Sequence, residues 1–314
     1  MLANLRSYLK KHLPPTSRAF KRGVKDIVVE VHKASDTATT TSARLHSEHQ
    51  LALDELAASV AVVARQQDVA MQTLERVEST MEALERSADK QGRAISEVLW
   101  ADVFRDTTSS SEWMRDRSFS PGRWAVGYPY LYVLYRVLSE IRPRRILELG
   151  LGQSTRMIAQ YVEAHDDIRH VVVEHDREWI DFFARNYRLP DSTSVVKLDW
   201  GYVPFKEATG VRVYAGFSEA LHDKQFDLIS IDGPLGGDMK DYARIDVLGL
   251  LPECLGPSFV IMIDDCERTA ESRTLSEMQN ALSEAGIDYR SCCYSGDKDL
   301  GLLCSTDLAF LCSM

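Results

Sequence analysis

The chain has 314 residues, a formal net charge of −10 and 45% hydrophobic residues. This length allows one full α/β domain plus a further segment, and the acidic balance argues against nucleic acid as a partner. No apolar run reaches the length of a membrane span, and the N-terminus lacks the apolar core of a signal peptide. All six cysteines follow residue 250 without a C-x-x-C pair, which favours free thiols in a reducing cytosol over zinc or disulfides. We therefore expect a cytoplasmic protein.

Residues 1–33 form a basic leader in which leucines recur at near-helical spacing until Pro14-Pro15 ends the pattern. A short basic amphipathic helix can rest on the anionic inner face of a membrane, so we expect either this peripheral contact or a solvated leader without a partner. Residues 34–44 are small and polar, which is typical of a linker.

Residues 45–105 carry a heptad repeat that no proline interrupts, and this pattern predicts a coiled coil. Two polar core positions, Gln67 and Gln91, tend to fix the register at a cost in stability. A seam of this kind must be buried, and self-association into a homo-oligomer is the simplest solution, with packing on another protein as the alternative. The seam consists of Leu53, Leu56, Val60, Val63, Gln67, Ala70, Leu74, Val77, Met81, Leu84, Ala88, Gln91, Ile95 and Val98.

A break is predicted at Asp106–Ser111, and an amphipathic helix at Pro129–Ile141. Several aromatic side chains precede or begin this helix. Trp124 and Tyr128 either pack in the core or form a lid over a bound cofactor, and the sequence leaves both roles open.

Strands and helices alternate from Arg145 onward, which predicts a mostly parallel sheet with helices on both faces. We expect strands at 146–149, 170–174, 194–198, 226–231 and 258–263, a short strand at 211–214, helices at 176–187, 242–251 and 271–285, and a closing antiparallel pair at 289–294 and 308–312.

The most informative stretch follows the first of these strands. Gly150 and Gly152 break the strand, and Ser154 or Thr155 can cap the helix that follows. This strand, turn and helix start suits the polar part of a nucleotide-like cofactor. A dinucleotide fingerprint would need a glycine in place of Thr155, and the lysine of a phosphate-binding P-loop is also absent.

An acidic residue stands near the end of each of five successive strands. The carboxyl ends of parallel strands meet at one edge of a sheet, where ligands bind. Solvated or helix-capping acids would explain any one of them, but a shared site explains the whole set better. The acids are Glu148, Glu174, Asp199, Asp232 and the pair Asp264-Asp265.

Chemistry suggests a role for each acid. Glu174 follows Gly152 at the spacing that places a carboxylate on the hydroxyls of a cofactor ribose, and Asp199 could accept from an adenine amino group. Asp232, Asp264 and Asp265 lie further along the edge, on the substrate side. Carboxylates clustered in this way either bind a hard cation such as Mg²⁺ or share a proton and act as a base.

Five motifs together resemble class I S-adenosylmethionine (SAM)-dependent methyltransferases: ILELGLGQST, VVVEHD, VVKLDW, FDLISIDGP and VIMIDDCER, which begin at residues 146, 171, 195, 226 and 260. Their details are similar to a bacterial branch associated with sugar and surface-polysaccharide genes. The resemblance covers about Trp124 to the end, and we assign residues 112–314 to this domain.

The resemblance implies a Rossmann-like sheet of seven strands with one antiparallel strand. Carried over by motif, Glu148, Gly150, Gly152 and Ser154 would face the methionine part of SAM. Catechol-type relatives hold Mg²⁺ with an acid after the fourth strand and an Asp-Asn pair after the fifth. Asp264-Asp265 departs from that pair, so a metal at Asp232, Asp264 and Asp265 stays open.

The expected function is SAM-dependent O-methylation of a hydroxyl on a sugar or glycan precursor. Asp232 or Asp265 would serve as base or metal ligand. A different small-molecule acceptor, or transfer to nitrogen or carbon, stays open. The alternative is a coiled-coil scaffold whose SAM-binding domain is inactive or regulatory.

Overall fold

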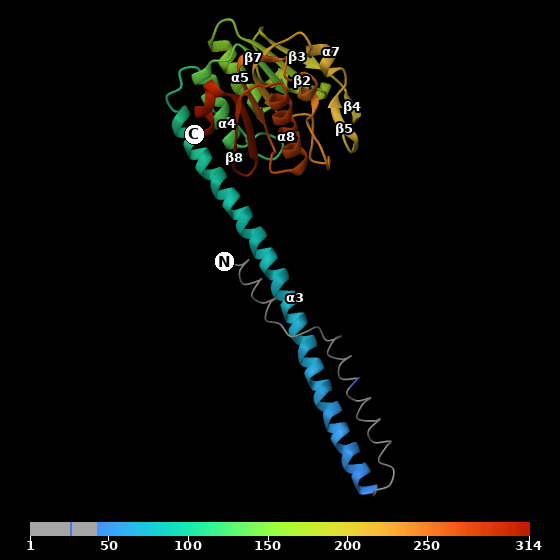
Figure 1. Ribbon diagram of the computed structural model, residues 1–314. Coiled ribbons are helices and arrows are strands. Elements are labelled where there is room, and N and C mark those ends of the chain that lie inside the picture. Colours follow the sequence, from blue (N-terminus) through green and yellow to red (C-terminus); the bar gives the residue numbers. More distant parts are fainter. Residues whose placement is uncertain (1–25, 27–42) are drawn as a thin grey trace. The chain divides into compact units, whose positions relative to one another are not determined.

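The computed structural model describes residue 26 and residues 43–314, with side chains from residue 49 onward in the second range (Figure 1). The predicted leader, apart from residue 26, and nearly all of the predicted linker therefore lie outside the described residues. The chain divides into two compact units, Met1–Asp89 and Lys90–Met314. The second unit carries the sheet and the predicted site.

A single helix, α3 (Ala43–Thr108), contains the heptad repeat. The long helix expected over residues 45–105 is thus present, and it runs past Asp106 before it ends. Leu56, Val63, Val77 and Leu84 of the predicted seam are exposed on the helix. The partner that would cover them stays a prediction.

The sheet of the second unit has seven strands in the order β3-β2-β1-β6-β7-β9-β8. Six strands run parallel to one another and β9 runs antiparallel to both of its neighbours. This confirms the predicted Rossmann-like sheet, in which the strand order reverses between β1 and β6. The strands are β1 (Arg145–Leu149), β2 (Arg169–Glu174), β3 (Thr193–Lys197), β6 (Phe226–Ile231), β7 (Leu255–Ile263), β8 (Tyr289–Ser295) and β9 (Asp299–Ser305).

Alternate residues of the central strands enter two different cores, as expected for a parallel sheet covered on both faces. Ile146 packs with α4 (Tyr128–Arg136) and α5 (Gln153–Ala164), whereas Leu147 packs with α7 (Phe217–Leu221) and α8 (Thr269–Glu284). Helix α6 (Arg177–Asn186) begins at the N-cap Asp176, whose carboxylate accepts from two backbone N–H groups. Helix α4 continues into a short π-helical turn, η1 (Val137–Ile141).

Three predicted elements differ from the structure. The short strand expected at 211–214 is part of a hairpin of β4 (Trp200–Phe205) and β5 (Ala208–Tyr214). The helix expected at 242–251 is only a 3₁₀ turn, η2 (Asp246–Gly249), because Arg244 has a left-handed backbone (φ 59°) and ion pairs with the strand-end acids.

The strand expected at 308–312 is the 3₁₀ segment η3 (Thr306–Cys312). Its buried residues, Leu308 and Leu311, are three positions apart, which is a helical period. The closing antiparallel pair is instead β8 with β9.

All six cysteines are free thiols. Among the described residues, none of the helices combines the length and the apolar character needed to cross a membrane.

Candidate functional site

The structure brings the predicted acids after β6 and β7 together. Asp232 follows β6, and Asp264 and Asp265 follow β7. One carboxylate oxygen of each lies within 4.8 Å of the other two. These three acids therefore form a compact acidic cluster at the predicted edge.

The loop between β1 and α5 uses its backbone donors internally. The N–H groups of Gly150, Leu151 and Gly152 donate to the Val173 carbonyl (2.9 Å), Glu174 Oε2 (3.1 Å) and Thr155 Oγ1 (2.8 Å), respectively. None of these three donors is left for a phosphate.

Helix α5 begins with an extended Gly152 at the N-cap (φ −166°), so Ser154 and Thr155 lie in its first turn. From there Thr155 caps the helix start, because its Oγ1 accepts from the Gly152 N–H. Within the described part of the chain, a Cβ on Gly152 would meet no atom within 4 Å. The first-turn N–H groups of a helix have no acceptor within the helix. The loop thus leaves space beside a helix end that favours an anionic group.

Glu174 ties the glycine loop to the start of the next segment. Its Oε2 accepts from Leu151 N–H, and its Oε1 accepts from the N–H groups of His175 (2.7 Å) and Asp176 (2.9 Å). The carboxylate is buried and fixed in orientation. The indole of Trp179 donates to the Leu151 carbonyl at 2.7 Å, which holds the loop from its other side.

Glu148 is fully buried within β1. Its Oε2 lies 3.1 Å from His170 Nε2 on the neighbouring strand, and its Oε1 has no hydrogen-bond partner among the described residues. A buried carboxylate oxygen without a donor is costly, so this atom fits a donor supplied by a bound molecule or by water.

Asp199 differs from the other acids because its carboxylate is exposed and paired with Lys197. Trp200 comes next in the chain and stacks on His175 with ring centroids 3.8 Å apart. Within the described part of the chain, the buried indole N–H of Trp200 finds no acceptor. Since His175 directly follows Glu174 in the chain, the stacked pair lies next to Glu174 and close to Asp199, whose carboxylate the sequence suggested for adenine.

Two buried cations, both missed from the sequence, neutralise the acidic cluster. Arg244 Nη2 lies 3.2 Å from Asp232 Oδ1 and 2.6 Å from Asp265 Oδ2. Lys298 Nζ lies 3.1 Å from both Asp264 Oδ2 and Asp265 Oδ1. Arg244 lies in the segment just before η2, and Lys298 lies in the β8–β9 turn. Neither residue belongs to a strand-end motif.

The surroundings separate the three acids by pKa. Burial raises the pKa of Asp232 to about 6 and raises that of Asp264 well above its ordinary value. Burial also acts on Asp265, but Arg244, Lys298 and Arg268 together bring its pKa below the ordinary value. Asp265 stays ionised, whereas Asp232, with 15% of its side chain exposed, can exchange a proton near neutral pH.

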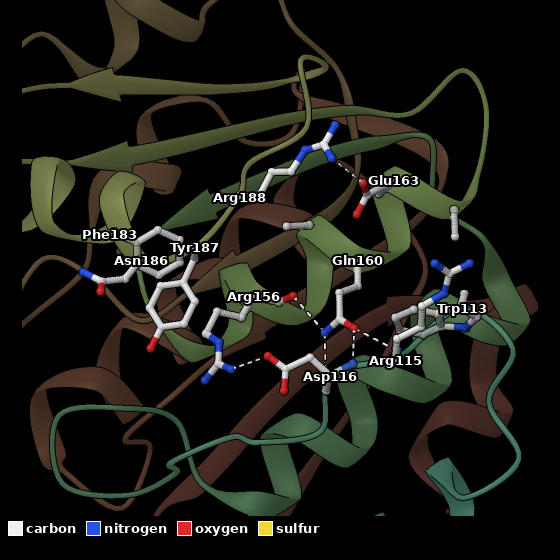
Figure 2. A pocket seen from close by; sticks show the side chains of 12 residues that line it. Trp113, Arg115, Asp116, Arg156, Gln160, Glu163, Phe183, Asn186, Tyr187 and Arg188 are labelled. Carbon is white, nitrogen blue, oxygen red and sulfur yellow. Dashed lines mark hydrogen bonds and ion pairs between the residues drawn. The ribbon is translucent and has the colours of Figure 1, made fainter.

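A pocket of about 430 Å³ lies elsewhere, between α5, the end of α6 and the segment before α4 (Figure 2). Its polar groups bind one another. Arg156 pairs with Asp116 at 2.6 Å, and the side chain of Gln160 accepts from the Arg115 and Asp116 backbone and donates to carbonyls. Because this pocket lies beside the helices and away from the strand ends, we place the candidate site at the acidic edge.

No protein-family model and no curated protein sequence matches this chain. Solved structures with a similar fold include the SAM complex of the O-methyltransferase TomG from Streptomyces achromogenes, involved in tomaymycin synthesis, with 17% identity, a TM-score of 0.43 and coverage of 67% of this chain and 97% of that chain. Another is SAH-bound methyltransferase PaMTH1 from Podospora anserina, with 16% identity, a TM-score of 0.38 and coverage of 71% and 94%. A third is an O-methyltransferase from Bacillus cereus in complex with SAH, with 13% identity, a TM-score of 0.36 and coverage of 68% and 90%. Likeness at this level carries no information about activity.

Proposed function

We propose that the chain is a SAM-dependent methyltransferase whose cofactor binds across the carboxyl ends of β1 and β2. The main support is the buried carboxylate of Glu174 beside a glycine loop whose own N–H groups are already bonded. Such a site disfavours a phosphate and favours a ligand that brings hydroxyl donors and positive charge.

The residues present fit the parts of SAM. Glu174 would hold the ribose hydroxyls, and the first turn of α5, with Ser154, would meet the methionine carboxylate. Among the described residues Glu148 Oε1 lacks a donor, which a cofactor ammonium group would supply. Gly152 would allow close approach of the cofactor to the backbone, whereas Gly150 has a positive φ and a Cβ there would meet the Asp232 backbone at 3.2 Å. Bound SAM would supply an activated methyl group.

The adenine side is proposed at the end of β3. The sequence suggested Asp199, and its backbone carbonyl accepts from Ala215 N–H while its carboxylate pairs with Lys197. The indole N–H of Trp200 lacks an acceptor among the described residues, and His175 stacks on the indole. Because His175 and Arg212 both lie over the Trp200 ring, the indole N–H is the group that supports an adenine beside Glu174.

On the acceptor side, Asp232 is the proposed base. Its side chain is partly exposed, and Arg244 fixes its orientation at 3.2 Å. A hydroxyl placed against Asp232 would donate to the carboxylate and lose its proton to it during transfer. Asp265 would act through Arg244, whose guanidinium it binds at 2.6 Å.

The acceptor is proposed to be a hydroxyl of a sugar or glycan precursor, on the basis of the sequence resemblance alone. A different small molecule, or a nitrogen or carbon acceptor, would use the same edge. A cytoplasmic location and membrane contact by the basic leader are also proposals, and the leader lies outside the described residues.

A scaffold function is the second candidate, because exposed apolar residues such as Leu84 line α3. The SAM-binding domain would then be regulatory or inactive. The two candidates differ in whether any acceptor is methylated.

The experiment is a methyl-transfer screen with sugars and phenols, followed by the variant Asp232→Asn. We expect transfer by the wild type and a loss of about 10²-fold or more in kcat for the variant, with SAM binding retained. Asp223→Asn, at an exposed aspartate, is the matched control. Full activity in Asp232→Asn would remove Asp232 as the base, and SAM binding without transfer to any acceptor would favour the scaffold.

A further inference from the structure

The acidic cluster has the composition of a divalent-cation site. Oxygens of Asp232, Asp264 and Asp265 lie within 4.8 Å of one another, and the sequence resemblance leaves Mg²⁺ open at these residues. Mg²⁺ requires near-octahedral oxygen ligands at about 2.0–2.1 Å and usually keeps several waters. Whether it fits depends on what else these oxygens bind.

The oxygens already bind nitrogen atoms of the protein. The ammonium group of Lys298 lies 3.1 Å from both Asp264 and Asp265, and only 7% of this lysine is exposed. Arg244, with 3% exposed, bridges Asp232 and Asp265 and also donates to the Asp264 carbonyl at 2.9 Å.

The charges around the cluster also argue against a bound Mg²⁺. Lys298 and Arg244 set two buried positive charges directly against the three carboxylates. Arg268 lies 3.0 Å from Asp265 Oδ1 but is shared with Glu271, which it approaches to 3.5 Å. A divalent ion among them would stand within a few ångströms of two buried cations, where Coulomb repulsion is weakly screened. The residues present do not fit Mg²⁺.

We propose that the Lys298 ammonium is the built-in cation of the acceptor site and takes the place of a divalent metal. This inference rests on the proposed methyltransferase function. The ammonium donates to Asp264 Oδ2 at 3.1 Å and forms an ion pair with Asp265 Oδ1 at the same distance. An ammonium has three N–H donors, so Lys298 can also donate to the acceptor oxygen.

The roles then divide within the cluster. The acceptor hydroxyl gives its proton to Asp232, and the negative charge that develops on its oxygen is stabilised by Lys298. Asp264 and Asp265 keep the ammonium in position, each at 3.1 Å from Nζ. The lysine serves as an electrostatic group.

The first test measures Mg²⁺ binding. Its readout is the Tm of the full chain with and without Mg²⁺, in the absence of SAM. The wild type should show no shift in Tm at about 10 mM Mg²⁺. Lys298→Ala removes the internal cation and should gain a Mg²⁺-dependent rise of about 2–4 °C. Lys197→Ala, which removes a surface lysine paired with Asp199, should gain none. A Mg²⁺-dependent rise in the wild type, or none in Lys298→Ala, would overturn the proposal.

Lys298→Met, which keeps the apolar stem, replaces Lys298→Ala if the shorter side chain prevents folding. The second test is methyl transfer with EDTA, which should leave wild-type activity unchanged, whereas Lys298→Met should lose about 10²-fold. Loss of wild-type activity in EDTA would contradict the proposal. Calorimetry with SAM distinguishes the methyltransferase function from the proposal for Lys298. Absence of SAM binding would refute the methyltransferase function. The Mg²⁺ titration would still test whether Lys298 excludes a metal from the cluster.

Discussion

Glu97 of α3 and Asp297 of the β8–β9 turn are joined by a hydrogen bond of 2.9 Å from the Asp297 N–H to Glu97 Oε2. The other oxygen of Glu97 accepts from the N–H of Tyr128 at 2.6 Å, where α4 begins. Gly296 lies so close that a Cβ there would collide with Glu97. One carboxylate therefore ties the end of α3 to the turn that carries Lys298.

The first prediction concerns this tie. Glu97→Ala leaves the N–H groups of Tyr128 and Asp297 without their acceptor, and we expect it to lower the free energy of unfolding by roughly 2 kcal/mol. Urea unfolding measures the change. Glu85→Ala, at an exposed position on the same helix, should change stability by no more than about 0.5 kcal/mol. Equal effects of the two variants would contradict the structural role of Glu97.

The second prediction concerns where the second compact unit, Lys90–Met314, begins. Ser96 Oγ and Trp100 Nε1 both donate to the Ser295 carbonyl, at 2.6 and 3.0 Å. A chain that starts at Lys90 keeps these bonds and should unfold cooperatively and bind SAM as the full chain does. A chain that starts at Ser111 lacks them and should have a lower Tm by at least about 5 °C. The same Tm for both truncations would show that α3 contributes nothing to the unit.

The third prediction is a dependence of stability on pH. Burial raises the pKa of Asp246 from 3.8 to about 7; its Oδ1 accepts from Tyr214 N–H, and its Oδ2 has no partner in the described part of the chain. The folded state therefore binds more protons than the unfolded state between about pH 4 and 7, so stability falls as pH rises through this window.

Asp246→Asn removes the charge and keeps an oxygen for Tyr214. Relative to the wild type, its free energy of unfolding should gain roughly 2–3 kcal/mol between about pH 5 and about pH 8. Denaturant unfolding at the two pH values measures this. Because burial also raises the pKa of Asp232, the variant should retain part of the slope. An unchanged slope would be inconsistent with a buried, ionising Asp246.

The fourth prediction concerns the seam of α3. Light scattering should give the full chain at least twice its single-chain mass, because pairing would bury the exposed Val77 and Leu84. Val77→Glu with Leu84→Glu should shift the mass toward that of one chain, whereas Ser79→Glu, at an exposed position off the seam, should not. A single-chain mass for the wild type would mean that another partner covers the seam.

Most strands of the sheet could be predicted from the sequence, because they are apolar runs that end at acidic residues. The strand predicted at 226–231 has the same bounds as β6, and the acids after β6 and β7 lie together as expected. Such runs are local signals, and parallel strands bring their ends to one edge without further information.

The partners of those acids could not be predicted in the same way. Lys298 lies in a turn between antiparallel strands and Arg244 lies in an irregular segment, and no local pattern marks either as part of the site. His170 meets Glu148 only through the register of β2 against β1. Long-range contacts of this kind depend on the tertiary fold, as does the left-handed backbone of Arg244 that replaced the predicted helix.

Calorimetric titration of the purified full chain with SAM tests the central claim most directly. We predict saturable binding in the wild type. Binding should be at least tenfold weaker in Glu174→Ala, because hydrogen bonds to a charged group worth roughly 1.5–3 kcal/mol are lost. Binding should be unchanged in the control Glu178→Ala, at an exposed glutamate of α6. No heat of binding from a folded wild-type protein would contradict the account.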